Sequence, residues 1–403
     1  MTESSATIGR LIDSQRLREW SKVRPWRNLG WLALDYACVL IAGTLAVWFH
    51  LQRPGWGLHW SWEVPVIGAA VLLIGILQHR IALMGHEGSH YLLVPSRWWN
   101  DLLVELLIYY PLFSSVILYR KRHLGHHLHP NDPAHDPNLF GGKVERIWSK
   151  FPMSRQLFAI RYYLSFFWPP FVLRNLLDLF VVLTVGGSTS KSGSKSGRLN
   201  PALLGLLYFL LLMAAMIGPL WLGMRSWPLM TALFVVAVVV WTWLPADSFA
   251  KGGNFAFHLK GAALMKLCFY TAFFLTLGHL TGQYGGGVVV AFLLLWVLPL
   301  IYVFPYLMVL REIYQHANAG TGDLDNSRII HANAFLRWAL FCYGNDLHLI
   351  HHLYPGIPHD RLAEVHETLA KESAAYRAGV QETFGIAQSS PAGHSLMDAL
   401  TTS

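Results

Sequence analysis

Three histidines at helical spacing mark the segment Asn345-Asp-Leu-His348-Leu-Ile-His351-His352-Leu-Tyr-Pro355-Gly-Ile-Pro358. Positions i, i+3 and i+4 lie along one side of a helix, so the three imidazoles can face the same ion. The same spacing occurs in His123-Leu-Gly-His126-His127, and a related pair occurs in His86-Glu-Gly-Ser-His90. Eight of the twenty histidines therefore fall in three short clusters, and we interpret all eight as metal ligands.

The number of clustered histidines indicates how many ions they bind. Imidazole suits iron, zinc, copper and nickel, so the ligand type alone does not select the metal. A single zinc ion takes three or four protein ligands. Eight histidines are too many for one ion and are consistent with two. Each three-histidine cluster can serve one metal or divide its ligands between two neighbouring metals.

Outward from these clusters, the composition is typical of a membrane protein. Apolar residues make up 54% of the 403 residues and charged residues 13%, whereas soluble domains average roughly 25% charged. A membrane-spanning helix needs about 20 mainly apolar residues. We expect an all-α polytopic membrane helix bundle whose crossings lie near residues 31–49, 64–84, 201–222, 228–245, 264–280 and 287–310.

The basic residues predict the orientation of this bundle. Lys and Arg gather in the N-terminal tail and in segments 119–155, 186–198 and 251–266, and the intervening loops hold few. By the positive-inside rule, both termini and every histidine cluster lie on the cytoplasmic side. The net charge of +8 is thus attributed to membrane-flanking segments, and no nucleic acid is expected as a partner.

The expected organisation has six parts. A cytoplasmic N-terminal tail (1–30) precedes a first membrane block with the first histidine box (31–118). A cytoplasmic or interfacial segment (119–200) holds the second box, an amphipathic stretch at 158–185 and a Gly/Ser-rich linker at 186–197. A second membrane block (201–310), a cytoplasmic cap with the third box (311–385) and a disordered tail (386–403) follow.

The order HxxxH, HxxHH, HxxHH, with Pro355 and Pro358 after the last box, resembles the membrane fatty-acid desaturase and hydroxylase superfamily. The resemblance covers residues from about 64 to 366. It implies a helical cap that holds two iron ions, and O2-dependent oxidation of an unactivated C–H bond in a fatty-acyl or similar lipid chain, with desaturation as the preferred reaction. It also implies a ninth ligand, His316, from the helix that leaves the last membrane span, with Glu312 one turn earlier.

Further residues are candidates for supporting roles. Glu87, Asp136 and Asn345 are placed to orient imidazoles through their second nitrogen. No cytochrome b5-like segment is apparent, so we expect electrons from a separate protein such as a ferredoxin. An acidic carrier would dock on Lys121, Arg122, Lys143 and Arg146. The same charges could instead bind anionic membrane lipids.

Several alternatives stay open at this point. His86-Glu87-Gly-Ser-His90 also matches HExxH, the motif of zinc proteases, although that function leaves both HxxHH clusters unexplained. A histidine-rich metal transporter is a second competitor, but transport sites usually lie near the bilayer midplane. Within the superfamily, hydroxylation, carotenoid-type ketolation and oxidative decarboxylation to a terminal alkene compete with desaturation. Neither the length nor the headgroup of the substrate can be read from the sequence.

Overall fold

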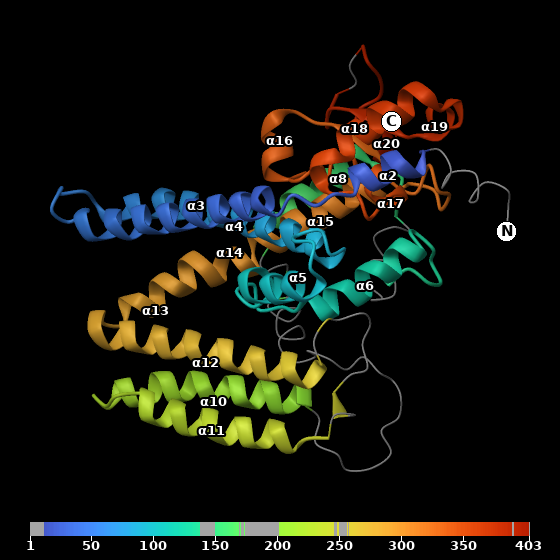
Figure 1. Cartoon of the computed structure of the whole chain (residues 1–403). Helices are drawn as coiled ribbons and strands as arrows, with labels where there is room; N and C mark the ends of the chain where they lie inside the picture. The colour runs from blue at the N-terminus through green and yellow to red at the C-terminus, as the bar shows by residue number, and fades with distance from the viewer. Residues whose placement is uncertain are drawn as a thin grey trace.

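Two long helices form the first layer of the molecule. The computed structural model describes residues 12–137, 150–168, 201–245, 258–388 and 391–402, with isolated positions between these ranges. After the short helix α2 (Ser14–Trp20), α3 (Pro25–Gln52) begins with a proline in its first turn, where no backbone N–H is needed. The turn η1 (Trp60–Trp62) leads into α4 (Glu63–Ser89), which lies along α3 (Figure 1). The first histidine box therefore stands at the far end of α4.

A second layer is built from α10 (Pro201–Trp221), α11 (Trp227–Trp243) and α12 (Leu259–Tyr284), which lie side by side (Figure 1). The chain then returns through α13 (Gly287–Phe292), the π-helical segment η6 (Leu293–Val297), α14 (Leu298–Ile301) and α15 (Val303–His316). Helix α15 packs against α4, and Gly75 allows this approach because a Cβ there would collide with Val303. Small residues at such crossings are common between membrane helices.

The exposed apolar surface of these helices indicates whether they contact lipid or water. In α3, Leu40, Ile41 and Leu45 expose between 56% and 69% of their surface, which suits lipid contact rather than water. In the described residues, five segments are long and apolar enough to cross a membrane. These segments are Ser14–Gln52, Trp60–Ser89, Leu203–Leu220, Leu259–Tyr284 and Gly287–His316. The expected all-α membrane bundle is confirmed. The remaining predicted crossing, at residues 228–245, corresponds to α11, an apolar helix of 17 residues.

Short elements form a cap at the end of the α3–α4 pair (Figure 1). They begin with α5 (Arg97–Val104), the π-helical segment η2 (Glu105–Tyr109) and α6 (Val116–Leu128), then β1 (Met153–Ser154), α8 (Arg155–Phe158), η3 (Ala159–Tyr163) and η4 (Leu164–Phe167). After α15 come β2 (Ile329–His331), α16 (Ala334–Ala339), α17 (His348–Leu353), η7 (His359–Arg361), α18 (Leu362–Glu372), α19 (Ala374–Gly379), β3 (Glu382–Phe384), α20 (Leu396–Leu400) and β4 (Thr401–Thr402). Two small parallel pairs, β1–β4 and β2–β3, tie the C-terminal elements to earlier ones.

The C-terminal segment differs from the disordered tail expected from its sequence. A capping box starts α20, in which Ser395 and Asp398 satisfy each other's backbone N–H groups. Leu396 and Leu400 are then fully buried in a core shared with Phe158 and Ile313. The segment is too short to predict as a helix by periodicity, and its order comes from these distant apolar partners. Most of the predicted amphipathic stretch, together with the predicted linker at 186–197, lies outside the described residues.

Candidate metal centre

The first histidine box is held where α4 ends. A helix leaves its last carbonyl groups without partners, and here side chains from the next two helices satisfy them. The amide of Asn100 donates to the Gly88 carbonyl (2.8 Å), and the guanidinium of Arg120 donates to the carbonyls of Gly88 (3.1 Å) and Ser89 (2.8 Å). Arg120 is itself buried and paired with Asp101. Because Arg120 lies on α6, one turn before His123, this contact sets the first box against the second.

The nine predicted ligands gather in two groups. In the first, which we call the five-histidine group, the members come from α4, the loop after it, α6 and α17: His86, His90, His123, His127 and His351. In the second, the four-histidine group, they come from α6, α15 and α17: His126, His316, His348 and His352. Within each group, one nitrogen per residue lies within 4.8 Å of the others.

Helical geometry explains how the boxes are divided. On α6, positions i and i+4 of the box (His123 and His127) face the five-histidine group, and position i+3 (His126) faces the other. On α17 the division is reversed, because only the i+3 residue, His351, joins the five-histidine group. Residues i+3 and i+4 point about 100° apart around a helix axis, so each helix can line both groups. The two groups meet where the rings of His127 and His352 stack, with centroids 4.4 Å apart.

The nitrogen atoms fit a metal better than a network of hydrogen bonds. The Nε2 atoms of His90 and His123 lie 2.8 Å apart, and those of His127 and His351 lie 3.0 Å apart. Neither ring nitrogen of His86 has a hydrogen-bond partner among the described residues, although the side chain is almost fully buried. Buried polar atoms are rarely left without a partner, and a metal ion would supply one. These residues therefore fit the ions implied by their type and number.

The protonation state also favours metal binding. Burial lowers the pKa of His90 to about 3, and it lowers the pKa values of His123, His127, His348, His351 and His352 well below the usual value. The rings are therefore neutral near pH 7, which is the form of imidazole that binds metals.

Two ligands of the four-histidine group are oriented through their other nitrogen. Asp136, which is fully buried, lies with its Oδ2 atom 2.8 Å from Nδ1 of His126. Nδ1 of His316 lies 3.0 Å from the backbone carbonyl of Asn326. If Nδ1 carries the proton in both rings, each Nε2 atom is left to face the group. Asp136 thus contacts the second nitrogen of a predicted ligand, and its role in orienting that ligand stays a prediction.

The other predicted supporting residues make different contacts. Glu87 lies on α4 with its Oε2 atom accepting a hydrogen bond from the backbone N–H of His359 (2.9 Å), while Oε1 stands 3.7 Å from Nδ1 of His86. Asn345 accepts a hydrogen bond from Arg311 through its side-chain oxygen (3.2 Å). Glu312 lies beside the same arginine, with 3.7 Å between the charged atoms. Asn345 and Glu312 thus both contact Arg311.

Sequence reasoning missed the loop contacts that support this centre. The backbone N–H of Asn131 donates to Asp136 (2.9 Å), and its side-chain amide donates to the carbonyls of Gly320 and Asn326 (both 2.7 Å). Asn131 has a φ of 60°, a conformation that asparagine tolerates better than most residues. The run His129-Pro-Asn-Asp-Pro does indicate a turn, but it does not reveal which carbonyls the turn will contact.

The basic residues proposed for donor docking fall partly within the structure. Lys121 and Arg122 are exposed on α6, beside the second box. Lys143 and Arg146 lie outside the described residues.

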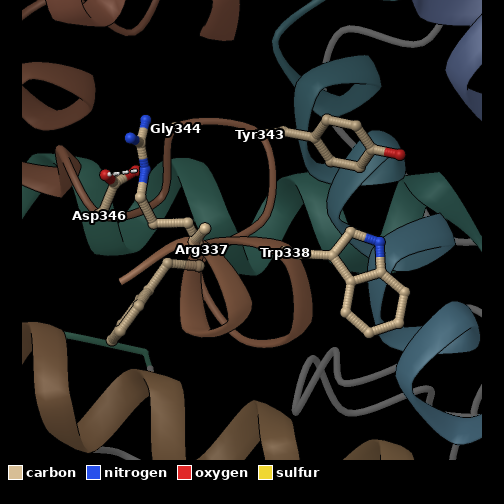
Figure 2. Close-up of a pocket in the computed structure, with 7 residues that line it drawn as sticks. Arg337, Trp338, Tyr343, Gly344 and Asp346 are labelled. Carbon is tan, nitrogen blue, oxygen red and sulfur yellow. Dashed lines mark ion pairs between the residues drawn. The ribbon is translucent and has the colours of Figure 1, made fainter. Parts of the chain in front are cut away.

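A shallow cavity of about 300 Å³ lies on the cap, away from the histidines (Figure 2). Its lining includes Trp338, Tyr343 and the ion pair between Arg337 and Asp346 (2.9 Å), and no histidine is among the residues that line it. We therefore do not assign the substrate to this cavity.

Comparison with known proteins agrees with the geometry of the site. The sequence profile described as "Fatty acid desaturase" matches residues 60–260 and 247–384, a span that includes all nine histidines. The chain belongs to this family. It is also similar to a dihydrorhizobitoxine desaturase from Bradyrhizobium elkanii, with 33% identity over 146 residues. That match covers 36% of this chain and 38% of the relative, so it spans less than half of either protein. Membership of this family supports oxidoreductase chemistry of the desaturase kind.

Proposed function

We propose that this chain uses O2 and two iron ions to desaturate a fatty-acyl or similar lipid chain at the membrane. The observation that carries the proposal is the division of nine buried or half-buried histidines into two adjoining groups, each large enough to hold one ion. The family supports an oxidation of the desaturase kind and a lipid as the substrate. The relative is named as a desaturase, which supports the formation of a double bond. The substrate in its name, dihydrorhizobitoxine, is the relative's substrate and is not proposed for this chain.

The proposed division of labour assigns His86, His90, His123, His127 and His351 to one iron, and His126, His316, His348 and His352 to the other. Bound iron would supply the O2 chemistry that removes hydrogen from an unactivated C–H bond, with electrons from a separate carrier. The protein's own contribution is to hold the ions and to keep water away from them. Burial of the histidines serves both purposes, because it keeps the imidazoles neutral and excludes solvent.

Positioning is the second contribution of the chain. Asp136 and the Asn326 carbonyl hold the rings of His126 and His316 so that their Nε2 atoms converge, 3.3 Å apart. The substrate must then present one carbon to the ions in a fixed pose. The helix that carries the second histidine box begins among apolar side chains: Val116 begins α6 two turns before His123, and it belongs to the same core cluster as Phe113 and Tyr270. An acyl chain suits such surroundings.

The zinc-protease alternative is disfavoured by the contacts of Glu87. In that mechanism the glutamate of HExxH must face a metal-bound water and take its proton. Here an oxygen of Glu87 is occupied by the backbone N–H of His359, and both histidines of the motif join a group of five. The matched family also supplies a function for the two HxxHH boxes, which the protease leaves unexplained.

We further propose that an acidic electron carrier, such as a ferredoxin, docks beside α6. Lys121 and Arg122 are exposed next to the second box, so electrons would arrive close to the histidine groups. Charge reversal at Lys121 (Lys121→Glu) should raise the KM for the carrier and weaken the dependence of turnover on ionic strength, because that attraction is screened by salt. If the KM and the salt dependence stay as in the unaltered protein, these charges bind anionic lipid instead.

The basic flanks of the helices support a cytoplasmic position for the cap and both termini. An epitope placed after Ser403 should then be cleaved by protease in inside-out vesicles and protected in intact cells. Protection in inside-out vesicles would reverse the proposed orientation.

The central experiment combines metal analysis with O2 uptake. Purified protein should hold two irons per chain and consume O2 only when reductant and a lipid substrate are both present. Mass spectrometry of the product then separates the reactions: loss of two hydrogens means desaturation, whereas gain of oxygen or loss of carbon dioxide means hydroxylation or decarboxylation. His127→Ala and His352→Ala should each lower the iron content and abolish turnover. His394 is exposed, and His394→Ala should change neither the iron content nor turnover. One zinc per chain without O2 uptake would overturn the proposal.

A further inference from the structure

A third cluster of metal-binding side chains lies on the cap. His331, His366 and Glu382 each place one ligand atom within 4.8 Å of the others. They come from three separate elements, β2, α18 and β3. None of them belongs to the two groups described above.

The strand pair holds two members of this cluster in place. Strands β2 and β3 run parallel, and the register pairs His331 with Phe384, two residues after Glu382. The His331 ring stacks on Phe384, with centroids 4.4 Å apart and planes within 10°. Its Nε2 atom lies 2.7 Å from an oxygen of Glu382. Imidazole and carboxylate are therefore already directed at each other.

The third member is oriented as histidine ligands usually are. Nδ1 of His366 lies 2.7 Å from the hydroxyl of Tyr376, which is fully buried. If Nδ1 donates to that hydroxyl, Nε2 keeps its lone pair and can bind a metal ion. Burial also lowers the pKa of His366, which keeps the ring neutral at physiological pH.

The surrounding charges favour a cation. Glu367 interacts electrostatically with His366, and Asp346 does so with His331, so two further acidic groups lie near the cluster. The nearby Arg337 is paired with Asp346 (Figure 2). A histidine–glutamate pair elsewhere in the chain differs from this cluster, because an arginine already balances its negative charge. His50 and Glu63 are 3.0 Å apart, but Arg53 completes that pair and supplies the positive charge itself.

We propose that His331, His366 and Glu382 bind one divalent transition-metal ion, such as zinc, with a fourth position open to water. Two imidazoles and a carboxylate form a ligand set that zinc accepts. Ligand atoms on one tetrahedral zinc ion lie about 3.3 Å apart, given bonds of about 2.0–2.1 Å. Small rotations of these half-exposed side chains would widen the 2.7 Å contact between His331 and Glu382 and shorten any longer spacing, none of which exceeds 4.8 Å. The bound ion would join β2, α18 and β3, and so secure the C-terminal segment to the helix that follows the third histidine box.

The test measures zinc and iron separately in the untagged, full-length protein. Zinc is titrated against a chromophoric chelator after iron loading, and both metals are counted per chain. We expect one zinc beyond the iron in the unaltered protein, and its loss in Glu382→Gln and in His331→Gln with the iron content unchanged. Tyr376→Phe keeps all three ligands and should weaken zinc binding about 10- to 100-fold. His50→Gln is the matched control, because it removes a similar histidine–glutamate contact and should leave both metals unchanged.

The outcomes separate this site from the proposed iron centre. Unchanged zinc affinity in Glu382→Gln and His331→Gln would overturn the zinc site, whatever the iron content. Failure of the iron proposal would appear instead as absent iron in the unaltered protein, with the zinc comparison still readable. Retained iron in a variant also shows that the variant is folded, so a loss of zinc can then be assigned to the missing ligand.

Discussion

Replacing Asp136 with Asn should empty one half of the proposed iron centre and spare the other. The carboxylate is fully buried and lies 2.8 Å from Nδ1 of His126, a member of the four-histidine group. It also accepts the backbone N–H of Asn131, 2.9 Å away. An amide in this place keeps the size of the side chain but loses the negative charge and one of its two acceptor oxygens. The remaining oxygen can still accept the hydrogen bond from His126, but the bond is no longer to a charged group and holds the His126 ring less firmly.

The expected size of this effect follows from the negative charge that the acceptor of this hydrogen bond loses. A hydrogen bond to a charged group contributes about 1.5–3 kcal/mol, and each 1.4 kcal/mol changes an equilibrium constant by about tenfold. Iron binding at the four-histidine group should therefore weaken by about 10- to 100-fold, which is also the usual cost of removing a residue that orients a metal-bound histidine. Asp136 contacts His126 and Asn131, neither of which belongs to the five-histidine group, so the iron bound by that group should remain.

The assay is iron titration of the metal-free protein with a competing chelator. Asp136→Asn should bind one iron as tightly as the unaltered protein and the second one more weakly, with little O2 consumption. Asp132→Asn is the control, since Asp132 lies in the same loop and contacts the exposed His135 (2.7 Å) rather than a proposed ligand. If Asp136→Asn binds both irons with unchanged affinity, the carboxylate does not orient a metal ligand and the reasoning is refuted.

Three further predictions follow from buried groups around the centre. Glu87→Gln should keep its iron and O2 uptake, because the amide oxygen can still accept the His359 backbone N–H. Complete loss of activity in a protein that holds zinc but no iron at the two histidine groups would instead favour the protease. Burial lowers the pKa of His90 to about 3 and that of His359 to about 4, below the value of about 6.5 for the unfolded chain. The unfolded chain takes up these protons first, so the iron-free protein should be most stable above pH 6.5. Below pH 6.5, each of these two histidines should lower the free energy of unfolding by roughly 1.4 kcal/mol per pH unit, until the pH reaches its pKa in the folded protein. Thermal unfolding at pH 7.5 and 5.5 would measure this loss of stability. Arg120→Ala should lower the free energy of unfolding by about 3–5 kcal/mol, because it leaves Asp101 buried without its partner. Chemical denaturation that shows less than about 1 kcal/mol would contradict this role.

The histidine boxes could be predicted because all their information is local. Spacings of i, i+3 and i+4 require only that the segment be helical, and α6 and α17 are helical over both HxxHH boxes. The sequence also indicated that such a box can serve two metals, but not which histidines join which group. That division depends on how α6 and α17 face each other, and therefore on tertiary packing.

Contacts made by backbone atoms and by distant segments left no signal in the sequence. The carbonyl that orients His316 belongs to Asn326, and every residue has a carbonyl, so the residue type carries no information. The cap cluster of His331, His366 and Glu382 has ligands separated by 35 and 16 residues, far outside any helical spacing. Only the pairing of β2 with β3 and the packing of α18 bring them together.

The crosswise division of the boxes has a consequence for assembly of the centre. Each HxxHH helix contributes to both groups, so neither group can form unless α6 and α17 are both docked in their final orientation. The last member of the four-histidine group, His316, ends α15 and depends on a loop carbonyl that is also bonded to Asn131. Metal affinity is therefore coupled to docking of the cap on the bundle, since ions that bind only the docked state stabilise it by mass action.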